Sequence, residues 1–240
     1  MCKPRAIIIT LVLCIIASMP IGDNASAARQ TGMQKSKVDL ARMRLENVLL
    51  EEDSIAQLLS RFSFAFSIPI GLEIARGGDE PTFYRIELKK GTLSDLLTQF
   101  VTDHPEYAWQ IENDVVNIFP KENFRDPVVR ELLETKISSF SLRAKTSTVA
   151  FGQNLLCSPE TKRILELNGI TYDTGYLGGF YIQQLGQQYS FDVTNMQLKS
   201  ILDKAIKESP VAKNWIISNK TSPQKIFLRV NAQLEYSQKP

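Results

Sequence analysis

The sequence has few of the residues from which enzymes and metal centres are built. It contains one histidine, His104, and no HExxH or CxxC motif. Any Ser-His-Asp triad or Cys–His pair would have to use His104, which stands beside Pro105 at a helix end, where a cation suits the helix dipole. Transition-metal sites need clusters of His and Cys that this chain does not offer. We therefore predict no catalytic residues, no cofactor and no metal.

The chain also lacks a large excess of charge of either sign. The chain has 28 Lys and Arg against 26 Asp and Glu, a formal net charge of +2. Proteins that bind nucleic acids usually carry a concentrated basic excess. The near balance of charge argues against a nucleic-acid partner, although β-α-β orders also occur in RNA-binding modules.

The N-terminal segment has the features of an export signal. Lys3 and Arg5 precede an apolar run over residues 7–17, which is too short to span a bilayer, and small residues follow it. We predict that residues 1–27 are a signal peptide cleaved before Ala28. A retained membrane anchor is the disfavoured alternative, so the predicted location is periplasmic or secreted, with no retained transmembrane segment.

Cysteine is nearly absent from the predicted mature chain. Only Cys157 lies beyond residue 27, so no intrachain disulfide can form there. Its nearest following basic residue is Lys162, and we predict a small buried hydrophobic side chain rather than a reactive thiol.

What the chain does contain is an internal repeat. Residues 86–105 and 191–210 carry one apolar pattern, and a tryptophan follows each copy with one residue of slippage. The matched positions pair Ile86 with Phe191, Leu88 with Val193, Leu93 with Leu198, Leu96 with Ile201, Leu97 with Leu202 and Val101 with Ile206. Two copies indicate two related small domains rather than a solenoid. We expect Trp109 and Trp215 to cover the ends of two cores.

The region that contains the first copy, residues 44–119, is predicted to form a strand, a helix, two strands, a helix and a hairpin. Ser54 with Gln57, and Thr92 with Asp95, have the spacing of helix caps. Apolar residues at helical spacing follow each cap. The strands are expected over 44–50, 70–74, 83–88, 107–111 and 115–119.

The second copy predicts a related order. Strands are expected over 137–142, 189–193, 215–218 and 225–230, and helices over 146–156, 159–167 and 198–206. The fold class is therefore α+β, with two small tandem domains, each β-α-β-β-α-β-β-like with helices packed on small sheets. The predicted divisions are a flexible lead at 28–43, a first domain at 44–120, a linker at 121–128, a second domain at 129–231 and a tail at 232–240.

A glycine- and aromatic-rich stretch follows residue 171. It lacks the spacing of a phosphate-binding loop, but its aromatic side chains could form a contact patch for a partner. The candidate contact residues are Tyr172, Tyr176, Phe180 and Tyr181. The alternative is that this loop folds its aromatic rings back onto the sheet.

The first domain resembles a known family. Residues 54–62 with 70–74, and residues 83–119 with their GTLSDLL core, are similar to the secretin and TonB short N-terminal domain and to related secretin N-domains. The resemblance implies a periplasmic α+β domain that serves protein–protein contact or signal relay without catalytic residues. No secretin pore or barrel is expected after it, so a channel or receptor role is not implied.

Two functions follow as expectations. The first is a non-enzymatic, exported adaptor that binds another envelope protein through sheet edges and the aromatic segment. The alternative is an envelope small-ligand binder or enzyme with a site between the domains, near residues 172–181. The oligomeric state stays open.

Overall fold

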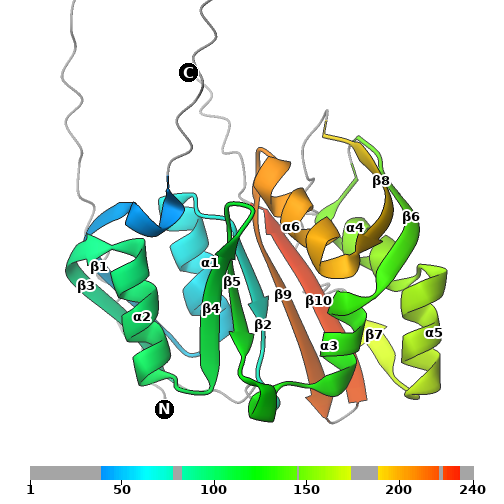
Figure 1. The fold of residues 1–240 in the computed structure, drawn as a ribbon, viewed down its shortest axis with the longest axis horizontal. Helices are drawn as coiled ribbons and strands as arrows, with labels where there is room; N and C mark the ends of the chain where they lie inside the picture. Colours follow the sequence, from blue (N-terminus) through cyan, green and yellow to red (C-terminus); the bar gives the residue numbers. More distant parts are fainter. Residues whose placement is uncertain (1–38, 78–82, 145, 174–188, 222–223, 233–240) are drawn as a thin grey trace, which may run out of the picture. The chain divides into compact units, whose positions relative to one another are not determined.

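A computed structural model describes residues 39–77, 83–144, 146–173, 189–221 and 224–232. This part of the chain has a mixed α+β fold with six α-helices and ten β-strands (Figure 1). In chain order they are β1 (Arg44–Glu52), α1 (Ile55–Phe66), β2 (Ile70–Glu73), β3 (Tyr84–Thr92), α2 (Leu93–Asp103), β4 (Tyr107–Glu112), β5 (Val115–Pro120), α3 (Pro127–Glu134), β6 (Lys136–Leu142), α4 (Thr148–Leu156), α5 (Pro159–Leu167), β7 (Thr171–Asp173), β8 (Phe191–Gln197), α6 (Leu198–Glu208), β9 (Ala212–Thr221) and β10 (Gln224–Ala232).

The strands form one large sheet and two small ribbons. The six-stranded sheet has the order β4-β5-β2-β9-β10-β7, and the antiparallel ribbons are β1-β3 and β6-β8. Each half of the chain builds the same parts. The ribbon β1-β3 corresponds to β6-β8. The triplet β4-β5-β2 corresponds to β9-β10-β7, with the same antiparallel and parallel pairings within each triplet. The predicted repeat is confirmed, and it extends to the first half of each copy.

The two halves meet within the large sheet rather than at a linker. Strand β2 of the first half pairs in parallel with β9 of the second, with Gly71 opposite Trp215 and Leu72 opposite Ile216. The described residues of both halves accordingly belong to one compact unit. The sequence predicted that each tandem domain would have its own sheet, whereas both share one sheet here, because a strand at the border of each triplet finds its partner in the other half.

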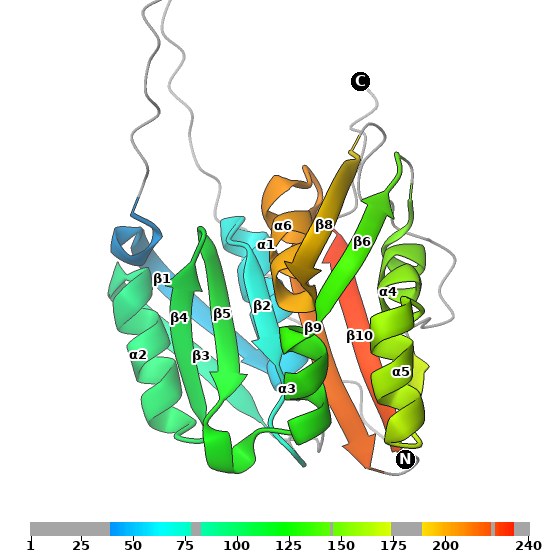
Figure 2. The same ribbon diagram turned by 45° about the vertical axis from the view of Figure 1, so that its right-hand side comes forward.

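The helices of the two halves cover opposite faces of this shared sheet. Leu72 and Ile216 belong to the core formed with α1 and α2, whereas Trp215 belongs to the core formed with α3, α4 and α6. Figure 2 shows β6, β8, α3 and α6 in front of the sheet, with β1 and β3 behind it. The second half therefore repeats the first with its strand directions and its helical face both reversed.

The one-residue slippage between the tryptophans has a structural cause. In β9, Trp215 pairs with Val230 and Asn214 with Asn231, but the next pair is Ala212 with Ala232, so Lys213 is an extra residue. A bulge of this kind restores the side-chain alternation after an insertion. It lets Trp109 and Trp215 both face the helices of their own half. Trp215 is buried, as predicted, and Trp109 is partly buried against its core.

The helix caps and the helix stripes agree with the sequence. Ser54 Oγ accepts a hydrogen bond from Gln57 N, and Thr92 with Asp95 forms a complete capping box. Leu97 and Leu202 are both fully buried on the matched helices α2 and α6. The side chain of Gln197, the N-cap residue of α6, makes no capping hydrogen bond.

The segment predicted as a linker is folded and docked. A 3-10 turn covers Glu122–Phe124, and α3 begins at Pro127 with Asp126 as its N-cap. Arg125 makes a bidentate ion pair with Glu73 of β2, and its Nε lies 2.8 Å from the carboxylate. The Pro and charged residues that suggested a linker instead serve helix capping and ion pairing.

Candidate functional site

The structure describes only one of the four predicted contact residues. Tyr172 lies in β7, half-buried, and packs against the core of the second half. Tyr176, Phe180 and Tyr181 lie outside the described residues. Cys157 is exposed and its Sγ lies 2.8 Å from the Tyr172 hydroxyl, so the prediction that Cys157 is buried was wrong. Cys157 is the C-cap of α4, one residue beyond the buried Leu155 and Leu156.

His104 lies in an aromatic setting at the end of α2. Its ring centroid is 4.9 Å from that of Tyr84 and 4.8 Å from that of Phe100. Its backbone N–H donates to Phe100 O and closes the last turn. Among the described residues no group of three or more His, Cys, Asp or Glu side chains could hold a metal ion.

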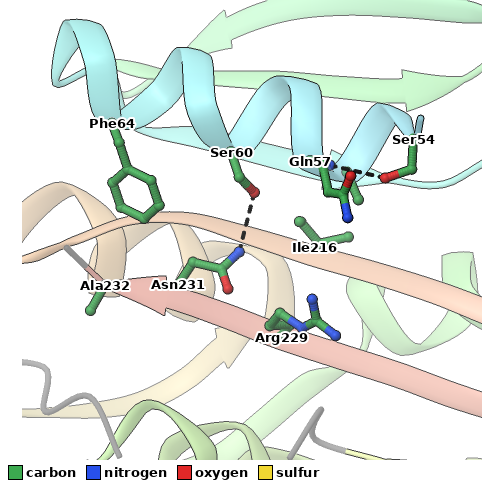
Figure 3. Close-up of a pocket in the computed structure, with 9 residues that line it drawn as sticks. Ser54, Gln57, Ser60, Phe64, Ile216, Arg229, Asn231 and Ala232 are labelled. Carbon is green, nitrogen blue, oxygen red and sulfur yellow. Dashed lines mark hydrogen bonds between the residues drawn. The ribbon is translucent and has the colours of Figure 1, made fainter. Parts of the chain in front are cut away.

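A groove lies where the two halves meet, on the α1 face of the sheet (Figure 3). One wall is the face of α1 that turns toward β9 and β10, and the floor is formed by these two strands. Its larger part has a volume of about 280 Å³ and an adjoining part about 180 Å³. Both parts share the walls formed by Ser54, Ala56, Ile216 and Arg229, so we treat them as one groove, called here the junction groove.

The charges in the junction groove are all positive. Arg229 and Lys220 line it, and none of the described lining residues is an Asp or a Glu. The ring of Phe227 lies between them, with Lys220 Nζ 5.1 Å and the Arg229 guanidinium carbon 5.2 Å from its centroid. Burial lowers the pKa of Arg229, and the carboxylate of Asp173 partly opposes that effect. Asp173 itself pairs with Lys225 at 2.9 Å.

Hydrogen-bond donors are in excess around the same groove. Arg229 Nε is buried and has no hydrogen-bond partner among the described residues, and the same holds for Asn214 Nδ2. Asn231 Nδ2 donates to Asn214 Oδ1 at 2.6 Å and to Ser60 Oγ at 3.3 Å. Figure 3 shows Asn231 and Ser60 bridging the gap between β10 and α1. Because buried donors are normally satisfied, these two atoms need explanation.

A second pocket lies on the opposite face, and its charges are paired. It has a volume of about 260 Å³ and includes Glu73, Arg125, Glu112 and Lys199 in its lining. Lys199 Nζ lies 2.8 Å from Asp203 and 2.9 Å from Glu112. Burial raises the pKa of Glu73 and of Asp203, although Arg125 and Lys199 respectively act against it. Each cation here has its own carboxylate, so these groups tie α6, α3 and the sheet together.

The third candidate is the open edge of the large sheet at β4. In the described residues, β4 pairs only with β5. Asn113 and Asp114 both have positive φ and form the two-residue turn, so Glu112 and Val115 are the hydrogen-bonded pair that closes the hairpin. The alternation of an antiparallel ladder then turns the backbone N–H and C=O of Ile111 and Trp109 away from β5.

No helix among the described residues has the length and apolar character needed to cross a membrane. Comparison with known proteins adds no relative: no family model, no curated protein and no solved structure matches this chain. Sequence reasoning missed the junction groove. Its only local signal is the alternation of Phe227, Arg229 and Asn231 on one face of β10, and the sequence gives no indication that α1 lies above them.

Proposed function

We propose that this protein is an exported, non-enzymatic adaptor of the cell envelope, built from two units like the short N-terminal domain of secretins and TonB receptors. It binds another envelope protein by adding a strand of that protein to the open edge β4. The observation that carries the proposal is the unpaired row of backbone groups at Trp109 and Ile111. An unpaired edge is a ready template for a strand from another chain.

The internal junction supports strand addition as the mode of binding. The equivalent of β4 in the second half is β9, and β9 is the strand that accepts β2 in parallel. The same type of edge is therefore paired at β9, whereas at β4 no described strand pairs with it. The strand β4 contains neither proline nor lysine, the residues that commonly block an edge.

The composition of β4 also suits a protein contact. Trp109 and Ile111 are partly buried, so each leaves apolar surface beside the open backbone groups. Aromatic residues contribute strongly to protein interfaces. At the other end of the sheet, Tyr172 lies on the short strand β7, and we propose the segment that follows it as a second contact region.

The test is capture of the partner by edge variants. Ile111→Pro removes the outward N–H without removing a ladder bond to β5, and Ile111→Val is the control that keeps the N–H. We expect the Pro variant to lose the protein that the wild type and the Val variant both capture from an envelope extract, with the bound protein identified by mass spectrometry. Ile111→Lys provides a second edge block if the Pro variant unfolds.

Equal capture by all folded variants would contradict the proposal. If the captured protein is a second copy of this chain, the edge serves self-association and the adaptor role fails.

A further inference from the structure

We propose that the junction groove is a binding site for a carboxylate carried on a small apolar group. This inference does not depend on the partner proposed for β4, because the groove is formed by α1, β9 and β10. Its first support is the charge of its lining, in which Arg229 and Lys220 are present and no described residue is acidic. An anion that entered would meet two cations in this lining.

The cations are held in place without an acidic partner. Both contact the ring of Phe227, and no ion pair joins either of them to a described residue. The acid whose charge acts on Arg229 is Asp173, and its carboxylate is 2.9 Å from Lys225 Nζ. Asp53 precedes the groove residue Ser54 in sequence but does not line the groove. A planar guanidinium presents a fork of donors that fits a carboxylate.

The start of α1 adds donors to the same wall. Ser54, Ile55 and Ala56 line the groove, and Ser54 Oγ accepts the hydrogen bond of Gln57 N. The N–H groups of the two residues between them, at the positive end of a 12-residue helix, remain available to a ligand. The buried Nε of Arg229, which has no acceptor among the described residues, is a further unsatisfied donor beside this wall.

The far end of the groove is apolar, which indicates that the ligand carries an apolar group beside its carboxylate. Phe64 and Ala232 line it, and the hydrogen-bonded pair Ser60 and Asn231 lies between this end and Arg229 (Figure 3). Cavities of about 280 and 180 Å³ admit a group the size of a side chain rather than a nucleotide. The ligand class is therefore a small carboxylic acid with an aromatic or aliphatic group, either free or as the C-terminal residue of a polypeptide.

The experiment is a titration of the 15N-labelled protein followed by NMR. Phenylacetate is the probe, and phenylacetamide and inorganic phosphate are the controls for charge and for the apolar group. We expect saturable shifts at the amides of Ile55 and Ala56 and at Arg229 Nε–H, with phenylacetate preferred over both controls. Arg229→Met should weaken binding about tenfold or more, since a charge-assisted contact is lost. Arg163→Gln removes an exposed cation elsewhere and should change nothing.

Arg229→Lys keeps the charge without the planar fork and should give an intermediate affinity, which serves if the Met variant unfolds. Glycyl-phenylalanine tests whether the ligand is a polypeptide C-terminus, and its amide is the control that lacks the carboxylate. Tighter binding of the peptide than of phenylacetate indicates a polypeptide C-terminus, and weaker binding indicates a free acid. The proposal is overturned if phosphate binds as tightly as phenylacetate, if the shifts persist unchanged in the Met and Lys variants, or if phenylacetate causes no shifts at these groups.

Discussion

The indole ring of Trp215 lies directly over Gly71, across the strand pair that joins the two halves of the sheet. The two residues are in register between β2 and β9, and a Cβ on Gly71 would come within 2.4 Å of two ring carbons. The ring is fixed on its other side, since its Nε1 donates to Asp203 Oδ1 at 2.8 Å. Residue 71 must therefore lack a side chain for the halves to meet as they do.

Replacing Gly71 by Ala is accordingly expected to destabilise the fold by about 1–3 kcal/mol, because the added methyl group overpacks a buried contact. Urea unfolding gives the change in the free energy of unfolding. Trp215→Leu made in the Gly71→Ala background should lose less stability than in the wild type, since the clash is relieved. An unaltered unfolding midpoint in Gly71→Ala would show that the indole is free to move aside.

Leu97 and Leu202 are predicted to be equivalent core residues. Both are fully buried, one in each core, and truncation of such a leucine to Ala costs about 2–5 kcal/mol. Leu167 is 74% exposed at the end of α5, so Leu167→Ala is the matched control and should cost far less. Thermal or urea unfolding of the three variants would refute the equivalence if either core variant resembled the control.

The capping box of α2 makes a pH-dependent contribution to stability. The Thr92 backbone N–H, and then its hydroxyl group, hold the pKa of Asp95 below its ordinary value. A carboxylate with a depressed folded-state pKa stabilises the fold above its unfolded pKa of about 3.9 and loses that effect as the pH falls through the folded value. Asp95→Asn should thus be less stable than the wild type at pH 7, with the difference in Tm shrinking by about pH 2.

Asp103→Asn, in the last turn of α2, makes the same change of charge and leaves the capping box intact. The same loss of Tm in this control, or a difference for Asp95→Asn that is constant with pH, would show that the cap is not the cause.

Export is predicted to remove residues 1–27. The exported protein should begin at Ala28, because small residues stand at positions 25 and 27, where signal peptidase needs them. N-terminal sequencing of the protein from the envelope fraction measures this, and Ala27→Leu should block the cleavage. A protein that keeps Met1 would contradict the prediction.

The sequence by itself determined the local elements and the repeat. The apolar spacing of Leu93, Leu96, Leu97 and Phe100 and the pair Thr92–Asp95 specify α2, since the periodicity and the cap act within a few residues along the chain. The hairpin at Asn113–Asp114 is local in the same sense. One local signal was misread, because Asp126 with Pro127 is the start of α3 and not part of a linker.

Only the tertiary structure decided how the halves join and where a groove forms. The pairing of β2 with β9 brings together residues more than a hundred positions apart, and backbone hydrogen bonds between strands carry no sequence code of their own. The bulge at Lys213 and the reversal of the helical face follow from that pairing. Arg229 and the start of α1 become neighbours only because β9 and β10 extend the sheet beneath α1, so no pattern along the chain could have indicated their proximity.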